Sequence, residues 1–204
     1  ALTGEGKTLS AVNLAYSLSQ LGKRVLLIDC DMRRPSLNTK LNIKKVPGLS
    51  NFLTRQVILN EVVKTYSAGD CAFDVIAAGR NPPNPIELLS SDGMKDALEM
   101  FRDDYDYVIL DLPPLGEVSD ALVAATMVDG VLMVVRQNYC NSKALSTAIN
   151  QFDFVGGRVL GIILNCTAEG GGSYRYRGKG MRGYQNRYEG SYINVRRAEQ
   201  EDKS

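Results

Sequence analysis

The first eight residues contain the pattern that most restricts how this chain can fold. Ala1-Leu-Thr-Gly-Glu-Gly-Lys-Thr8 has the spacing of a phosphate-binding loop, in which a small residue and four others precede Gly-Lys-Thr. The glycines let backbone N–H groups turn toward a phosphate chain, the lysine reaches the outer phosphates, and the hydroxyl can ligate Mg²⁺. Residues 9–18 continue with apolar side chains at helical spacing. We therefore predict a nucleotide site that comprises Thr3, Gly4, Glu5, Gly6, Lys7, Thr8 and Leu9.

A phosphate-binding loop of this type follows a buried strand. The sequence begins at Ala1, within the loop motif itself. We therefore expect that the sequence starts inside its own active site and that the first strand of the fold lies outside it.

Composition narrows the possible chemistry. With 204 residues and 44% hydrophobic content, the chain can bury one substantial core. Its 24 basic and 23 acidic residues give no charge excess that would favour nucleic acid as a partner. There is no histidine, so a general base must be a carboxylate, a lysine, a tyrosine or water. No apolar run approaches the ~20 residues of a membrane span, and the four cysteines lack the spacing of a zinc site or a disulfide framework.

Short apolar runs alternate with segments of helical periodicity. Each run is nearly continuous, as expected of strands that are covered on both faces of a parallel sheet. The chain is therefore predicted to be an α/β protein with an open, mostly parallel sheet flanked by helices, whose ligand site lies beyond the C-terminal ends of the strands. The predicted strands are 24–29, 73–77, 107–111, 130–136 and 159–165, and the predicted helices are 8–21, 59–66, 85–102, 119–127 and 142–154.

Carboxylates follow two of the predicted strands. Asp29 and Asp31 end the first, and project from the same face if the chain is still extended there; Asp111 ends the third. With Lys7 and Thr8 on a neighbouring turn of the same sheet, such carboxylates can orient Mg²⁺ and its waters against nucleotide phosphates. Because histidine is absent, Asp29 or Asp31 is the leading candidate to align an acceptor hydroxyl and take its proton.

The composition changes after about residue 167. Residues 168–192 contain almost no aliphatic side chains, so they are predicted to form a flexible tail that follows a domain spanning residues 1–167. This tail contains five of the ten tyrosines of the chain, and composition alone leaves two roles open: phosphorylation, or adhesion to RNA through Arg and Tyr stacking. The five are Tyr174, Tyr176, Tyr184, Tyr188 and Tyr192.

Taken together, these motifs resemble the bacterial protein-tyrosine kinases of the capsular and exopolysaccharide synthesis systems, known as BY-kinases. The resemblance covers nearly all of residues 1–167, and the tyrosine-rich C-terminus is similar to the autophosphorylated cluster of that family. It rests on Gly4-Glu-Gly-Lys-Thr8, Asp29-Cys-Asp-Met-Arg-Arg-Pro35, Gly79-Arg-Asn-Pro-Pro-Asn-Pro-Ile-Glu-Leu-Leu89, Val108-Ile-Leu-Asp-Leu-Pro-Pro114, Val118-Ser-Asp-Ala121 and Leu160-Gly-Ile-Ile-Leu-Asn165.

The resemblance implies a role for each site residue. It places Lys7 and Thr8 in a Walker A motif, Asp29 and Asp31 in the additional Walker A′ motif of the family, and Asp111 in Walker B. It implies that ATP and Mg²⁺ are bound, that Asp29 serves the acceptor tyrosine, and that Thr8, Asp31 and Asp111 hold the metal. Asn165 resembles the position that meets the adenine edge.

The resemblance also implies partners and a location. In the family, subunits in a ring phosphorylate the tail tyrosines of their neighbours, and a transmembrane activator holds the kinase at the inner face of the cell membrane. By the same resemblance, the upstream strand and a helix before it that carries a ring-contact motif are expected to lie outside this sequence.

The main alternative is a ParA/MinD-type ATPase, a nucleotide-switched positioning module with the same P-loop fold. Such proteins resemble Lys-Gly-Gly-x-Gly-Lys-Thr at the loop, where the first lysine reaches across a dimer. Leu2 occupies that position here and carries no charge, and such a switch would not require a tyrosine-rich tail. A catalytically silent binding scaffold is a third hypothesis. The sequence favours the kinase.

Overall fold

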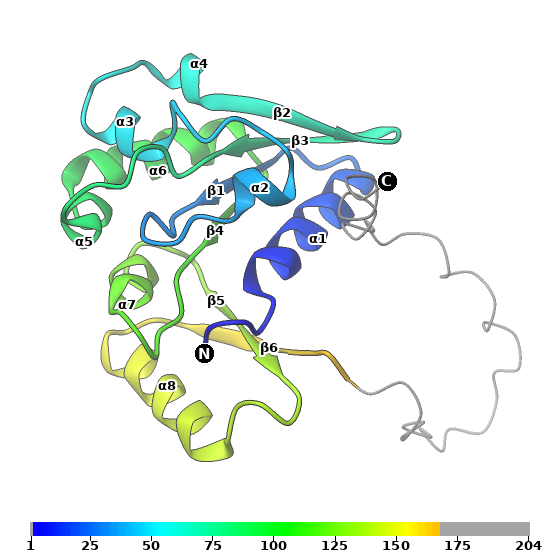
Figure 1. The fold of residues 1–204 in the computed structure, drawn as a ribbon, viewed down its shortest axis with the longest axis vertical. Helices are drawn as coiled ribbons and strands as arrows, with labels where there is room; N and C mark the ends of the chain where they lie inside the picture. Colours follow the sequence, from blue (N-terminus) through cyan, green and yellow to red (C-terminus); the bar gives the residue numbers. More distant parts are fainter. Residues whose placement is uncertain (1, 168–204) are drawn as a thin grey trace, which may run out of the picture. The chain divides into compact units, whose positions relative to one another are not determined.

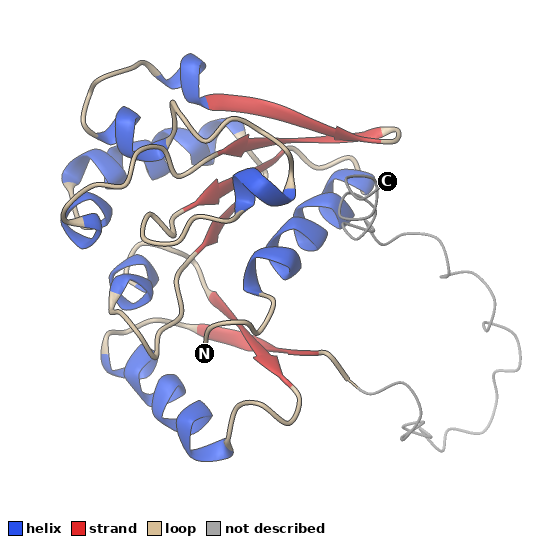
Figure 2. Cartoon of the chain, in the orientation of Figure 1, coloured by secondary structure: helices blue, strands red, loops and turns tan. Residues whose placement is uncertain are grey.

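The strands of the chain form two sheets in the computed structural model, which describes residues 2–167 (Figures 1 and 2). Within each sheet every pair of neighbouring strands is parallel except β2 and β3, where β2 forms an antiparallel edge. The first sheet has the order β2-β3-β1-β4, with β1 Val25–Asp29, β2 Val63–Ala68, β3 Cys71–Ile76 and β4 Tyr107–Asp111. The second pairs β5 Val131–Arg136 with β6 Val159–Asn165. The predicted α/β fold with an open, mostly parallel sheet is confirmed.

Helices separate most of the strands. The long ones are α1, α6 and α8, and Figure 2 shows that they lie against the sheets rather than within them. The helices are α1 Lys7–Gln20, α2 Leu37–Lys40, α3 Leu49–Leu53, α4 Leu59–Val62, α5 Pro85–Leu89, α6 Asp92–Asp104, α7 Asp120–Ala125 and α8 Ser142–Phe154.

Strand β1 is the centre of the larger sheet. All five of its residues are buried, because β3 and β4 flank it and helices cover both faces. Leu26 and Ile28 belong to a core cluster with Met94 and Phe101 of α6, whereas α1 contacts β1, β3 and β4. Burial of this many aliphatic side chains fixes β1 firmly, and its last residue, Asp29, is held at the C-terminal edge of the sheet.

Two of the predicted helices differ from the structure. The helix predicted over 59–66 ends at Val62, and residues 63–68 form strand β2. This segment and β3 make a hairpin whose turn includes Gly69 at φ 60°, and the paired rings of Tyr66 and Phe73 lie 5.4 Å apart. Cross-strand pairing therefore outweighs the helical spacing of these residues. The helix predicted over 85–102 is two helices, because Ser91 caps α6 by accepting the Met94 N–H at 3.2 Å.

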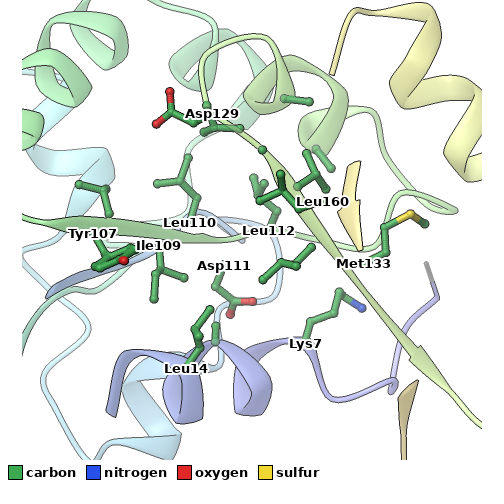
Figure 3. Close-up of a pocket in the computed structure, with 18 of the residues that line it drawn as sticks. Lys7, Leu14, Tyr107, Ile109, Leu110, Asp111, Leu112, Asp129, Met133 and Leu160 are labelled. Carbon is green, nitrogen blue, oxygen red and sulfur yellow. The ribbon is translucent and has the colours of Figure 1, made fainter. Parts of the chain in front are cut away.

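A cavity of about 750 Å³ lies between the two sheets (Figure 3). Its lining is largely apolar and comes from β4, β5 and α1, including Leu14, Ile109 and Met133. Lys7 and Asp111 also contribute to it. The cavity therefore lies between β4 and β5, next to the predicted nucleotide site.

Residues up to Cys166 form one compact unit. The predicted tail of residues 168–204, with its five tyrosines, lies outside the described residues. No helix in the described part of the chain is both long and apolar enough to cross a bilayer.

Candidate active site

The phosphate loop leads directly into α1. Gly4 and Gly6 have φ values of 77° and 89°, a left-handed conformation that glycine adopts without strain. Helix α1 begins at Lys7, and its first turn contains no acidic residue. The backbone N–H groups of that turn and the helix dipole therefore favour an anion at this end.

Asn165 of β6 contacts the loop, although it lies 160 residues after Glu5 in the sequence. Its side-chain amide donates to the Glu5 carbonyl at 2.9 Å. The same amide nitrogen would lie only 2.2 Å from a Cβ atom at Gly6, so a side chain there would displace the Asn165 amide from the loop. The prediction that Asn165 meets an adenine edge stays a prediction, but the structure does bring this residue to the nucleotide loop.

Lys7 lies between the loop backbone and the acidic strand ends. Its Nζ donates to the Leu2 carbonyl at 2.6 Å, and Figure 3 shows it on α1 near Asp111 of β4. Burial lowers the pKa of Lys7, while the negative charges of Glu5, Asp111 and Asp31 oppose that change. The ammonium group is therefore placed where acidic groups converge.

Asp29 and Asp111 end adjacent strands and lie opposite each other in the register of β1 and β4. Asp29 is fully buried; its two oxygens accept the Asp31 N–H at 3.1 Å and the Leu37 N–H at 3.2 Å. Burial, together with the charge of Asp111, raises the pKa of Asp29 to about 7. Burial also raises the pKa of Asp111 to about 6, against a hydrogen bond from the Thr8 side chain that lowers it. A neighbouring carboxylate also disfavours ionisation of each acid: Asp111 raises the pKa of Asp29, and Asp31 raises the pKa of Asp111.

Asp31 occupies the rim of the same site and is half-buried. Its Oδ1 accepts the backbone N–H groups of Arg33 at 3.2 Å and Arg34 at 2.9 Å. The Thr8 hydroxyl lies 3.1 Å from the Ser36 hydroxyl, so the segment after β1 also contacts the first turn of α1. The structure therefore gathers Lys7, Thr8 and all three predicted aspartates at one edge.

Several contacts at this edge were not predicted. The Arg33 guanidinium donates to both oxygens of Asp120, and Arg34 forms an ion pair with Glu117 at 3.5 Å. Glu117 also accepts the Thr3 hydroxyl. Asp120 lies in a motif that the sequence singled out, Val118–Ala121, but its spacing from Arg33 carries no signal of their pairing.

No group of three or more His, Cys, Asp or Glu side chains in residues 2–167 is arranged to hold a metal ion by itself. A metal at this edge would therefore need ligands besides the protein carboxylates, such as a hydroxyl, water or phosphate oxygen.

Comparisons with known proteins place this chain in a family. A model of the AAA domain matches residues 3–160. The tyrosine-protein kinase YwqD of Bacillus subtilis is 34% identical over 165 residues, which cover 81% of this chain and 69% of that protein. The chain belongs to the bacterial tyrosine-protein kinase family. A relative in this family, the putative tyrosine-protein kinase in the cps region of Klebsiella pneumoniae, is 36% identical over 160 residues; these cover 78% of this chain and 22% of that protein.

Solved structures agree with this family assignment. The kinase domain of the Escherichia coli tyrosine kinase ETK superposes with a TM-score of 0.78 at 36% identity, covering 86% of this chain and 69% of that one. The cell-division ATPase MinD of Pyrococcus furiosus superposes with a TM-score of 0.62 at 22% identity, covering 79% of this chain and 67% of that one. The likeness to MinD shows a shared P-loop fold alone.

Proposed function

We propose that this chain is the nucleotide-binding catalytic domain of an ATP-dependent protein-tyrosine kinase. The observation that carries the proposal is the convergence of Lys7 and Thr8 with Asp29, Asp31 and Asp111 at one sheet edge. The family membership supports the same activity, since relatives that are 34% and 36% identical to this chain are named tyrosine-protein kinases.

The residues present fit ATP and Mg²⁺. The left-handed Gly4 and Gly6 and the acid-free first turn of α1 offer backbone N–H groups to the phosphates. Thr8, Asp31 and Asp111 would hold the metal, and Asn165 would meet the base. When bound, Mg²⁺ neutralises charge on the phosphate oxygens and makes the outer phosphoryl group easier to transfer. Lys7 contributes a positive charge to the same oxygens.

The acceptor hydroxyl needs a carboxylate to align it and to take its proton. A pKa of about 7 suits Asp29 to that task at neutral pH. Both of its oxygens, however, accept main-chain N–H groups, and its side chain is closed off from solvent. Asp31 is the accessible member of the pair. Contact between Asp29 and a tyrosine would therefore require the segment of residues 31–37 to move.

We further propose that the acceptors are the tail tyrosines of a neighbouring subunit in a ring-like homo-oligomer. These tyrosines are Tyr174, Tyr176, Tyr184, Tyr188 and Tyr192, which lie outside the described residues. A transmembrane activator would hold the kinase at the inner face of the membrane, and the activity would regulate capsular or exopolysaccharide synthesis and export. The cps-region name of the Klebsiella relative supports this setting.

Phosphosite mapping tests the proposal. The complete protein with its activator is incubated with Mg·ATP, and peptides covering residues 174–192 are analysed by mass spectrometry. We expect phosphoryl additions on tyrosine, and a loss of at least about 100-fold in Lys7→Met, because removing one preorganised donor to a transition state typically costs that much. Lys143→Met, at an exposed position on α8, is the matched control and should keep full activity.

A mixture of Lys7→Met with an active protein lacking residues 168–204 then tests transfer between subunits. Phosphotyrosine on the Lys7→Met tail is the expected result, and an unmodified tail would exclude transfer in trans. ATP hydrolysis without any phosphotyrosine would instead favour the nucleotide-switched ATPase.

A further inference from the structure

An ion pair with one buried partner joins two of the sequence motifs at the edge of the site. Asp120, in the Val118–Ala121 motif, is fully buried, whereas the side chain of Arg33 is 40% exposed. The Arg33 Nε and Nη2 atoms each donate to a different oxygen of Asp120, both at 3.1 Å. This fork geometry fixes the direction of the guanidinium, which a single-point contact would not do.

The same arginine also forms part of the turn that holds Asp31. The Arg33 backbone N–H donates to Asp31 Oδ1, as does that of Arg34. The guanidinium of Arg34 contacts Glu117, and Glu117 accepts the hydroxyl of Thr3 in the phosphate loop. The turn after β1 is thus attached through side chains to the segment after β4, and through that segment to the loop.

Stability alone is a poor explanation for the pair. Desolvating a carboxylate as fully buried as Asp120 is unfavourable, and apolar replacements of buried ion pairs are often neutral or stabilising. What a bidentate pair does supply is a fixed geometry. The atoms that it fixes are those of the turn whose N–H groups hold the Asp31 carboxylate, and the charge of that carboxylate acts on Lys7 and Asp111.

We propose that Arg33 and Asp120 form a positioning pair that holds Asp31 in place to bind the metal of a metal–nucleotide complex. The inference rests on the proposed function, because it takes Asp31 as one of the residues that hold Mg²⁺. Arg33 and Asp120 act through the turn and need not touch the ligand. Partners of this kind, which orient metal ligands, typically change metal affinity by 10- to 100-fold when they are mutated.

The test measures binding rather than catalysis. A fluorescent ADP analogue is titrated against the complete protein, first with excess chelator and then over a range of Mg²⁺ concentrations. The main variant is Arg33→Met combined with Asp120→Leu, which removes both charges and leaves neither partner buried alone. Arg33→Lys keeps the charge but loses the fork. Arg24→Met breaks the exposed Arg24–Asp106 pair and serves as the matched control.

We expect the double variant to stay folded and to bind the analogue without Mg²⁺ as the parent does. For this variant, the Mg²⁺ concentration that gives half of the maximal increase in analogue binding should rise by about tenfold or more. Arg33→Lys should shift in the same direction by a smaller factor, and Arg24→Met should not shift. A folded double variant with the parental Mg²⁺ dependence would overturn the positioning role. Equal loss of binding with and without Mg²⁺ would also overturn it, since that result indicates general damage to the loop.

The two proposals fail separately. If the parent protein shows no tyrosine phosphorylation but the Mg²⁺ shift is present, the kinase proposal is wrong and the positioning pair stands. If phosphorylation occurs and the Mg²⁺ shift is absent, the positioning role is wrong and the kinase proposal stands.

Discussion

The two sheets of this domain bury their aliphatic side chains to different degrees. Every residue of β1 is buried, whereas β6 alternates between half-buried and exposed positions, with Leu160, Ile162 and Leu164 between 46% and 56% exposed. The larger sheet supplies Asp29 and Asp111, the turn after β1 supplies Asp31, and the smaller sheet supplies the neutral Asn165. Carboxylates with raised pKa values therefore come from the tightly packed region, because the burial that fixes their position also removes their water.

The largest expected effect compares the two sheets by truncation. Leu26→Ala at the centre of β1 should lower the free energy of unfolding by about 3–5 kcal/mol, since it leaves a cavity where collapse is hindered on both faces. Ile162→Ala on β6 should cost less than about 1 kcal/mol, because nearly half of that side chain already contacts water. Urea unfolding of both variants measures the difference. Equal losses would contradict the contrast between the sheets.

The next effect is electrostatic and belongs to the larger sheet. The pKa of Asp29 is about 7 in the folded state, against an ordinary value of 3.8. Between these values the folded state binds more protons than the unfolded state. Through Asp29, the free energy of unfolding therefore decreases as the pH rises from 4 to 7, and the decrease levels off above that. The contribution is about 3–4 kcal/mol.

Asp29→Asn should therefore remove that decrease. Urea unfolding of the variant and the parent at pH 4, 5.5, 7 and 8 measures it, because the difference between their free energies of unfolding should change with pH. Asn165→Ala in the smaller sheet removes no titratable group and should keep the parental pH dependence. A parallel pH profile for Asp29→Asn and the parent would show that Asp29 titrates normally.

The smallest expected effect is that of an added strand, which would join the two sheets by pairing with both β4 and β5. In residues 2–167, β4 pairs only with β1 and β5 pairs only with β6, and both strands line the cavity. In the 204-residue sequence taken by itself, six β-branched apolar residues joined ahead of Ala1 should raise the free energy of unfolding by about 2–3 kcal/mol, as their side chains become buried. They should also protect the β4 and β5 amides from hydrogen exchange. A Gly/Ser extension of equal length is the control, and equal stability of the two would exclude strand insertion.

Much of this arrangement could be predicted from the sequence, because local patterns encode it. The strands 107–111 and 159–165 and the helix 142–154 match the structure at both ends. The loop motif and the acids at strand ends place Lys7, Asp29 and Asp111 together through the general geometry of parallel sheets.

The errors arise where distant residues decide the outcome. Residues 63–66 have helical spacing, but the neighbouring β3 pairs with them and makes them a strand. Arg33 and Asp120 are 87 positions apart, and nothing in one sequence links them. The burial that gives Asp29 its unusual pKa also depends on helices from both halves of the domain, so the pattern at the strand end shows the acid but not its protonation.

The contact between Asn165 and the phosphate loop has a consequence for biosynthesis. The amide that bonds the Glu5 carbonyl is encoded 160 residues after it. During translation the loop leaves the ribosome before β6 and lacks this brace until β6 has emerged and docked beside β5. The nascent chain should therefore acquire its full affinity for nucleotide late, when most of the domain has already been made.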